Sequence, residues 1–577
     1  MRNYDLYPET KIKKYSGSWR GYQAIIDILL KKIKAMDKEK ITLAIECYPG
    51  IDNEEILHGL VEKLNPDKVI FADDAAFNGD RITDMVKRNL TDDRVFGVMS
   101  HFLMEEFFPE DAVLKEEDYA EGLTVVYGTG ATIISDPDLL IYADLARWEI
   151  QQRYRKGMSN WKINNPDEDI LKKYKRGYFF EWRIADRQKY RIFSGIDFLL
   201  DTNVKDDPKM ITGEDYRYGL EQVVKKPFRV VPYFDSSVWG GQWMKEKFGL
   251  NPDVINYGWA FDGVPEENSL YLRYGDVRVE VPSMNLVNQY PDELLGPKVR
   301  SRFGRVFPIR FDYLDTMDGG NLSLQVHPLT EYIQDRFGMH YTQDESYYIL
   351  DVKEDASVYL GVKNGTKLDE LMEDLEKAQQ GDYRFPDEKY INVFGAKKHD
   401  HFLIPAGTVH CGGTNTVMLE ISASAYIFTF KLWDWERTGL DGRPRPVHLQ
   451  HGRESIQTKY DTDWVEKNLI NRFETLHEDD DKKIERTGLH ELEFVETRRY
   501  WFEDKIIIET MESVNMLNLV EGEEAVVECP DGSFEPFTVH YGETFIVPEQ
   551  IKKYSIQPIN NPEGKKHAVI QAFIKNL

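Results

Sequence analysis

The segment GGNLSLQVHPL, residues 319–329, combines a strand pattern with two polar side chains that can bind metal. Side chains alternate between the two faces of a strand, so Gln325 and His327 share one face while Leu324 and Val326 share the other. A strand that is half exposed to water shows the same alternation. An amide oxygen and an imidazole nitrogen two residues apart can also converge on a metal ion. This segment alone leaves both interpretations open.

Two further segments carry a carboxylate and an imidazole at the ends of predicted strands. Glu345 follows His327 along the chain and opens the strand-like sequence DESYYILDV. His410 comes later, in DHFLIPAGTVHCGG, where a strand-like stretch is followed by a Pro-Ala-Gly turn. The sequence TVMLEISAS then predicts another strand.

The composition is that of a large, acidic, globular protein. Its 577 residues are too many for one core and predict about three or four domains. The formal charge of −27 comes from 73 Lys and Arg against 100 Asp and Glu. This charge argues against nucleic acid or an anionic membrane surface as the main partner. Because the sequence has no run of about 18 apolar residues and no apolar signal segment, we expect a cytoplasmic protein.

The three cysteines, Cys47, Cys411 and Cys529, lie far apart and form no CxxC pair. Neither a disulfide framework nor a cysteine zinc site is therefore expected, and any metal must be held by histidine and oxygen ligands. An anionic ligand would need cationic side chains close to its site, because the overall field of the protein repels it.

Residues 1–215 alternate short apolar strands such as ITLAIECY, KVIFADD, LTVVYGT and DLLIYAD with amphipathic helices such as GYQAIIDILLKKIKAM. This pattern predicts a mainly parallel sheet wrapped by helices. The order of the parts resembles the P-loop kinase layout, especially the uridine-kinase type. The phosphate-binding GK[ST] loop is missing, because ECYPGIDNEE carries acidic residues at that place: Glu46, Asp52, Glu54 and Glu55. We expect a degenerate kinase-like domain without ATP chemistry; a plain α/β packing domain fits equally well. YGTGA at 127–131 predicts a turn.

From about residue 225 onward, short strand-like stretches alternate with Gly, Pro and aromatic residues, which predicts an all-β body with helical insertions. One insertion is TKLDELMEDLEKAQQG, in which leucines recur at helical spacing. The segment from VEGEEAVVE to KKYSIQP predicts a second, smaller β barrel. The expected domains are a degenerate kinase-like α/β domain over 1–215, a metal-binding domain over 225–485 and a second β domain over 486–577.

Residues from about 225 to 577 resemble the class I (type I) mannose-6-phosphate isomerases, zinc enzymes of the cupin fold. The matching pieces are VWGG at 238–241, FPIRFDYLD before LSLQVHP, ESYYIL, LIPAGTVH, KLWDWER and GRPRPVHLQHGRESI. The resemblance implies mainly β cupin barrels, one Zn²⁺ per chain and a small-molecule sugar phosphate as substrate. The metal ligands that it implies are Gln325, His327, Glu345 and His410. The remaining histidines, such as His340, His399, His401, His448 and His451, are expected to be structural or exposed.

The resemblance also implies a reaction, the interconversion of an aldose phosphate and a ketose phosphate, most simply mannose 6-phosphate and fructose 6-phosphate. This isomerisation moves a proton between C1 and C2 through an ene-diol and needs a base and a group that stabilises negative charge. A zinc ion with neutral Gln and His ligands and one carboxylate keeps net positive charge and can act as a Lewis acid.

Three positions depart from the motifs of the family. Lys431, in TFKLWDWER, stands where bacterial relatives usually have an arginine beside the sugar phosphate or the reacting oxygens. A lysine supplies the same charge without bidentate geometry, although it could also reach only water. Asp312, in RFDYLD, stands where relatives commonly have a lysine, and Asp312 or the nearby Arg310 is the candidate for proton transfer. The sequence TQDE ends at Glu345, where relatives have GKTE.

Two other functions fit the sequence. The metal-binding region could hold a sugar with little turnover, the kinase-like half then being an interaction domain. Alternatively, an isomerase could be fused to an active sugar or nucleoside kinase, against which the acidic loop from Glu46 to Glu55 argues. The exact phosphosugar, the metal used in the cell and the oligomeric state do not follow from the sequence.

Overall fold

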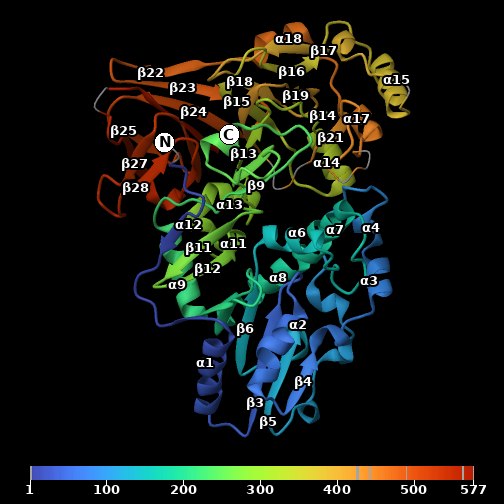
Figure 1. Ribbon diagram of the computed structural model, residues 1–577, viewed down its shortest axis with the longest axis vertical. Helices are drawn as coiled ribbons and strands as arrows, with labels where there is room; N and C mark the ends of the chain where they lie inside the picture. Colours follow the sequence, from blue (N-terminus) through green and yellow to red (C-terminus); the bar gives the residue numbers. More distant parts are fainter. Residues whose placement is uncertain are drawn as a thin grey trace. The chain divides into compact units, whose positions relative to one another are not determined.

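The protein was analysed as a computed structural model, which describes residues 3–381, 383–423, 426, 428–440, 442, 445–488, 490–561 and 564–575. The chain divides into two compact units, whose elements are labelled in Figure 1. The α/β unit consists of Glu9–Val223 and Ser269–Gln289. The β unit consists of Met1–Pro8, Val224–Asn268 and Tyr290–Leu577.

The α/β unit is built on a seven-stranded sheet in the order β2-β8-β7-β6-β3-β5-β4. Five neighbouring strands run parallel: β3 (Lys40–Cys47), β4 (Lys68–Phe71), β5 (Gly122–Gly128), β6 (Leu139–Asp144) and β7 (Phe198–Asp201). Parallel strands in such folds are covered on both faces and carry continuous apolar runs. β3 and β6 show this pattern, because nearly all of their side chains are buried. The mainly parallel sheet predicted from the sequence is confirmed.

The helices of the α/β unit lie between its strands along the chain. They include α1 (Tyr22–Ala35), α6 (Arg147–Arg155), α7 (Ile170–Arg176), α8 (Trp182–Ile192) and α9 (Gly213–Val224). The helical segment at residues 53–64 is composite, since α2 (Asn53–Ile56) continues as a π-helical turn and then a 3₁₀ turn. The strands β2 (Ser18–Arg20) and β8 (Lys209–Thr212) pair with each other in antiparallel fashion at one end of the sheet.

Two short segments group differently from the boundaries expected at residues 215 and 225. The hairpin β11 (Ser269–Tyr274) and β12 (Val277–Pro282) forms a three-stranded sheet with β1 (Glu9–Lys11) and belongs to the α/β unit. Residues Met1–Pro8 belong to the β unit, where the backbone N–H of Asp5 donates to Glu543. The division into three domains stays a proposal.

The first part of the β unit contains two sheets that position the candidate site. The six-stranded sheet contains, in order, β18 (His401–Ile404), β15 (Glu345–Val352), β20 (Thr416–Ser422), β13 (Arg310–Asp315), β10 (Trp259–Gly263) and β9 (Tyr233–Asp235). The five-stranded sheet contains β17 (Ile391–Gly395), β16 (Ser357–Val362), β19 (His410–Gly412), β14 (Leu324–Val326) and β21 (Phe430–Trp433). The predicted helical insertion is confirmed as α15 (Leu368–Gln379).

The last part of the β unit contains two further antiparallel sheets around their own core. One contains β22 (Glu474–Glu478), β23 (Lys482–Gly488), β24 (Val495–Phe502), β31 (His567–Ile574), β26 (Asn515–Glu521) and β29 (Thr544–Val547). The other contains β25 (Ile506–Glu509), β30 (Lys553–Pro558), β27 (Glu524–Glu528) and β28 (Phe537–His540). Phe502, Leu517, Phe545 and Tyr554 lie in the shared apolar core. A second β body is therefore present where the sequence predicted one.

Two simple expectations can be compared with the fold. None of the described helices is long and apolar enough to cross a membrane. No disulfide joins the three cysteines, which all lie in the described part of the chain and are free thiols.

Candidate metal centre

The six-stranded sheet carries two rows of buried polar side chains on one face. Directly paired residues of antiparallel strands point to the same side of a sheet, as do residues two apart on one strand. One row runs across β15, β20 and β13 as Glu345, Ser422 and Arg310, and the adjacent row runs across the same strands as Tyr347, Glu420 and Asp312. All six residues are buried. Buried polar groups are costly unless they find partners. Six of them on one face of a sheet therefore indicate a functional site.

The five-stranded sheet contributes a third row of polar side chains. His410 of β19 is paired with Gln325 of β14, and Gln325 is paired with Lys431 of β21. His327 directly follows the short strand β14, and its carbonyl accepts a hydrogen bond from the Gly407 N–H. His327 is fully buried, and Gln325 is only partly exposed. The segment is therefore not a strand with one face in water.

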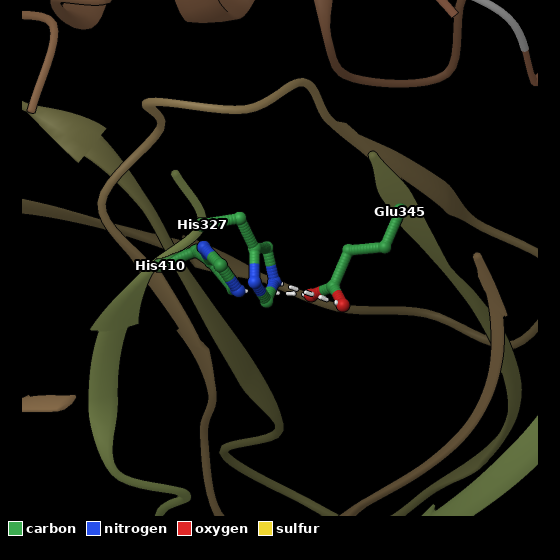
Figure 2. Close-up of side chains that lie close together, drawn as sticks. All are labelled: His327, Glu345 and His410. Carbon is green, nitrogen blue, oxygen red and sulfur yellow. Dashed lines mark ion pairs between the residues drawn. The ribbon is translucent and has the colours of Figure 1, made fainter. Parts of the chain in front are cut away.

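Side chains from the two sheets converge at His327, Glu345 and His410 (Figure 2). His327 Nε2 lies 3.0 Å from Glu345 Oε2, and His410 Nε2 lies 2.8 Å from Glu345 Oε1. The three side chains are completely inaccessible to solvent. Within the part of the chain that the structure describes, this triad is the one group of three His, Cys, Asp or Glu residues close enough together to hold a metal ion.

Hydrogen bonds at the Nδ1 atoms of His327 and His410 leave the Nε2 atoms, which face Glu345, with their lone pairs. His327 Nδ1 lies 2.8 Å from the Phe428 carbonyl oxygen, and His410 Nδ1 lies 2.8 Å from the Thr408 carbonyl oxygen. A carbonyl oxygen only accepts, so each Nδ1 carries a proton, and the Nε2 of a neutral imidazole keeps its lone pair. Two such nitrogens and a carboxylate would repel one another, and a cation among them removes the repulsion. The donor set of imidazole nitrogen and carboxylate oxygen fits Zn²⁺.

The carboxylate of the triad is held in its charged form. Although burial works in the opposite direction, the positive charge and hydrogen bonds of His327 and His410, when protonated in the metal-free site, hold the pKa of Glu345 well below its usual range. A deprotonated carboxylate is the form that binds metal, and metal affinity depends on this state.

Gln325 extends the group of possible ligands to four. Its amide Nε2 lies 3.2 Å from His410 Nε2. The amide oxygen and nitrogen exchange places when the amide group is flipped about its last bond, which would bring Oε1 to this position. The structure thus places all four side chains that the sequence singled out as ligands next to one another.

The three residues singled out for catalysis lie in the rows that lead away from the triad. Arg310 Nε donates to Asp312 Oδ1 over 3.1 Å. Both Arg310 Nη atoms and Asp312 Oδ2 are buried and find no hydrogen-bond partner among the described residues. Burial, opposed by the charge of Arg310, raises the pKa of Asp312 to about 6. Lys431 is half-buried at the end of the third row.

Several buried polar residues that lie near the triad were not identified from the sequence. Glu420 and Ser422 lie two residues apart in TVMLEISAS, so the alternation of that strand placed both on one face and gave a usable signal. Burial, with the charge of Asp312 next in size, raises the pKa of Glu420 well above its usual range. Tyr347 lies in the pattern ESYYIL, but its position beside His410, 5.9 Å between ring centres, depends on the pairing of the sheets.

The other histidines take different positions. His401 is buried, with Nε2 2.9 Å from Ser346 Oγ, and His399 contacts both Tyr348 and Glu521. His451 stacks on Phe430, and His340 is exposed. None of these contacts brings them into the metal-binding group found among the described residues.

In the α/β unit, backbone N–H groups at the turn of residues 127–131 donate to buried carboxylates. The backbone N–H groups of Gly130 and Thr132 donate to the buried carboxylate of Glu46, over 2.8 and 2.7 Å. The N–H of Thr129 donates to Asp73 over 2.9 Å. Burial is the main cause that raises the pKa of Glu46 to about 7 and that of Asp73 to about 6. Internal carboxylates therefore occupy the amide groups of this turn.

Comparison with known proteins gives one matching family model and several curated relatives. Residues 21–225 match the family model of a domain of unknown function, DUF8485. The chain is 28% identical over 234 residues to a probable mannose-6-phosphate isomerase, GmuF, of Bacillus subtilis, covering 40% of this chain and 68% of that protein. It is 23% identical over 305 residues to the mannose-6-phosphate isomerase ManA of the same organism, covering 52% of this chain and 86% of that protein.

A relative from Streptococcus mutans and one solved structure extend the comparison. The mannose-6-phosphate isomerase of Streptococcus mutans is 27% identical over 227 residues, covering 39% of this chain and 66% of that protein. The crystal structure of the mannose 6-phosphate isomerase from Bacillus subtilis superposes with a TM-score of 0.50 and 19% identity, covering 60% of this chain and all of that one, which shows a shared fold. Part of this chain is therefore homologous to mannose-6-phosphate isomerases, and this homology supports an isomerase.

Proposed function

We propose that the β unit is a zinc-dependent aldose-ketose isomerase acting on a sugar phosphate, most simply on mannose 6-phosphate and fructose 6-phosphate. The observation that carries the proposal is the buried triad of His327, Glu345 and His410, found in a chain whose relatives are mannose-6-phosphate isomerases. Gln325 would complete the ligand set for one Zn²⁺ per chain. When bound there, the ion supplies a Lewis acid for the sugar oxygens.

Arg310 and Lys431 give the substrate its positive partners. Arg310 lies two strands away from Glu345 in one row of side chains. Lys431 lies two strands away from His410 in the other row. Two strand spacings correspond to about 10 Å, the scale of a sugar phosphate. A phosphate or an ene-diolate oxygen needs such a cation, because this protein carries a net charge of −27. The Nη atoms of Arg310 support its assignment, since they form no hydrogen bond within the described chain and a ligand can satisfy them, although Nη1 also lies 3.7 Å from Glu267 Oε1.

Asp312 is the proposed proton-transfer residue. Its Oδ2 is buried without a hydrogen-bond partner among the described residues, while Oδ1 is held by Arg310 Nε. A pKa near 6 places this carboxylate in the range of an effective general base at neutral pH. Asp312 would take the proton from one sugar carbon and return it to the other, and Arg310 would keep the carboxylate in position.

The test is a coupled assay of mannose 6-phosphate turnover with zinc, then with chelator, then with zinc restored. Activity should disappear with the chelator and return with Zn²⁺. A well-folded, zinc-loaded protein that turns over no phosphosugar would overturn the proposal. That result would favour the alternative in which the β unit binds a sugar without converting it.

For the α/β unit we propose a degenerate kinase-like domain without ATP chemistry. The support is the acidic segment ECYPGIDNEE at the end of β3, where a phosphate-binding loop would lie. In addition, Glu46 and Asp73 take up amide groups of the nearby turn at residues 127–131. A packing domain without kinase ancestry is the second candidate, since the parallel sheet fits both. A cytoplasmic location stays a prediction.

A further inference from the structure

The sequence TQDE ending at Glu345, which departs from the isomerase motif, places a buried amide beside the triad. Gln343 is 2% exposed. Its Nε2 donates to Glu345 Oε2 over 3.0 Å and makes a longer contact of 3.4 Å with Glu420 Oε1. Its Oε1 accepts a hydrogen bond of 2.9 Å from the backbone N–H of Phe428. Both ends of the amide are therefore in use.

The peptide of Phe428 connects Gln343 to a second member of the triad. The Phe428 carbonyl oxygen accepts the Nδ1 proton of His327 over 2.8 Å, while the Phe428 N–H is bound by Gln343. Since His327 Nε2 itself faces Glu345 Oε2 over 3.0 Å, the contacts form a closed circuit through His327, Phe428, Gln343 and Glu345. The circuit fixes the tautomer of the imidazole and the direction of the carboxylate at once.

An amide side chain meets both requirements of this place in the circuit. The position needs an acceptor for the Phe428 N–H and a donor for Glu345. A lysine, which relatives have in GKTE, has donors only, and a glutamate has acceptors only when ionised. A glutamate would also place a second negative charge beside the deprotonated carboxylate of Glu345 in the buried interior.

We propose that Gln343 is a positioning residue of the metal centre, which orients Glu345 directly and His327 through the Phe428 peptide. This inference rests on the proposed metal site. Groups that hydrogen-bond to metal ligands typically change metal affinity about 10- to 100-fold when they are removed. Gln343 would act on the affinity and geometry of the metal site.

The experiment compares Zn²⁺ binding of full-length variants by competition with a chromophoric chelator, which needs no substrate. Gln343→Met keeps the length and volume of the side chain and loses both hydrogen bonds. We expect zinc binding to weaken about 10- to 100-fold, and the visible spectrum of the Co²⁺-substituted protein to change. Gln343→Glu should weaken binding as well, because it keeps an acceptor and loses the donor. The matched control is Gln571→Ala, a buried glutamine bound to Asn515 and Tyr500 in the C-terminal core, which should bind zinc as the wild type does.

The outcomes distinguish the positioning role of Gln343 from the existence of the proposed metal site. Unchanged zinc affinity and an unchanged Co²⁺ spectrum in folded Gln343→Met and Gln343→Glu would overturn the positioning role while leaving the metal site intact. A wild-type chain that binds no zinc in this assay would overturn the proposed function itself. If Gln343→Met fails to fold, as judged by circular dichroism, the Gln343→Glu result decides.

Discussion

Lys431 of β21 is paired directly with Gln325 of β14, so both side chains leave the five-stranded sheet on the same face. Because Gln325 is paired in turn with His410, the cation lies on the face that carries candidate metal ligands. The register therefore favours a role for Lys431 beside the substrate.

Changing Lys431 should separate substrate handling from metal binding. Lys431→Ala is expected to keep zinc and to lower kcat/KM by about 10²-fold, because a negatively charged group loses a nearby cation. Lys431→Arg should recover part of this loss, since it restores the charge. Zinc content by emission spectroscopy and steady-state kinetics check both points. A Lys431→Ala protein with wild-type kinetics would return Lys431 to a structural role.

His327→Ala should lower bound zinc and turnover together. The variant removes one ligand of the triad, and a site that has lost a ligand holds the ion less tightly. The control is His340→Ala, which changes an exposed histidine that lies outside the triad and should leave both quantities unchanged. Full zinc and full activity in His327→Ala would mean that the metal is held elsewhere.

Asp312→Asn tests proton transfer at nearly constant shape. The amide oxygen can still accept the hydrogen bond from Arg310 Nε, but the side chain can no longer take up a proton. Turnover should fall by about 10²- to 10⁴-fold while zinc is retained. Exchange of the C2 proton of the substrate with solvent deuterium, followed by NMR, should slow by the same factor. Undiminished exchange would assign the base to another residue.

Mg-ATP should give no heat of binding in calorimetry with the full-length chain. At the turn of residues 127–131 and at the residue that follows it, the N–H groups of Gly130 and Thr132 already donate to Glu46, and the carboxylate would repel a phosphate. An active P-loop kinase measured beside it serves as positive control. Binding in the micromolar range would contradict the degenerate kinase-like assignment and support the fused kinase.

The strands and candidate ligands were predictable where the signal was local. The alternation in LSLQVHPL placed Gln325 and His327 on one face, and continuous apolar runs gave the parallel strands β3 and β6. Glu345 and His410 could be singled out at predicted strands, but their joint role as ligands followed only from the resemblance to a family, because their approach depends on how two sheets face each other.

Contacts between distant parts of the chain had no sequence signal. Gln343 contacts the backbone of Phe428, 85 residues away. Almost every residue has a backbone N–H, so no sequence motif marks this contact. The pairing of β1 with β11 joins the first strand of the α/β unit to a segment that lies beyond all seven strands of its main sheet in the sequence, and no local pattern indicates this pairing. The N-terminal contact of Asp5 with Glu543 spans 538 positions.

His401 should make the stability of the protein depend on acid pH. Burial, with a smaller effect of the Arg499 charge, lowers the pKa of His401 from its ordinary value of 6.5 to about 3. Below pH 6.5 the unfolded chain binds a proton on this side chain and the folded chain does not, so stability is lost as the pH falls from 6.5 toward 3. The loss approaches about 1.4 kcal/mol per pH unit within this window.

The measurement compares thermal midpoints of the wild type and His401→Gln between about pH 7 and pH 4, across the range where an unperturbed histidine titrates. Glutamine can keep a hydrogen bond to Ser346 and binds no proton in this range, so the midpoint of the variant should fall less steeply with acid. His340→Gln is the control, because an exposed histidine can take up a proton in the folded chain as well. Parallel curves for wild type and His401→Gln would show that His401 accepts a proton in the folded protein, contrary to the pKa expected from its burial.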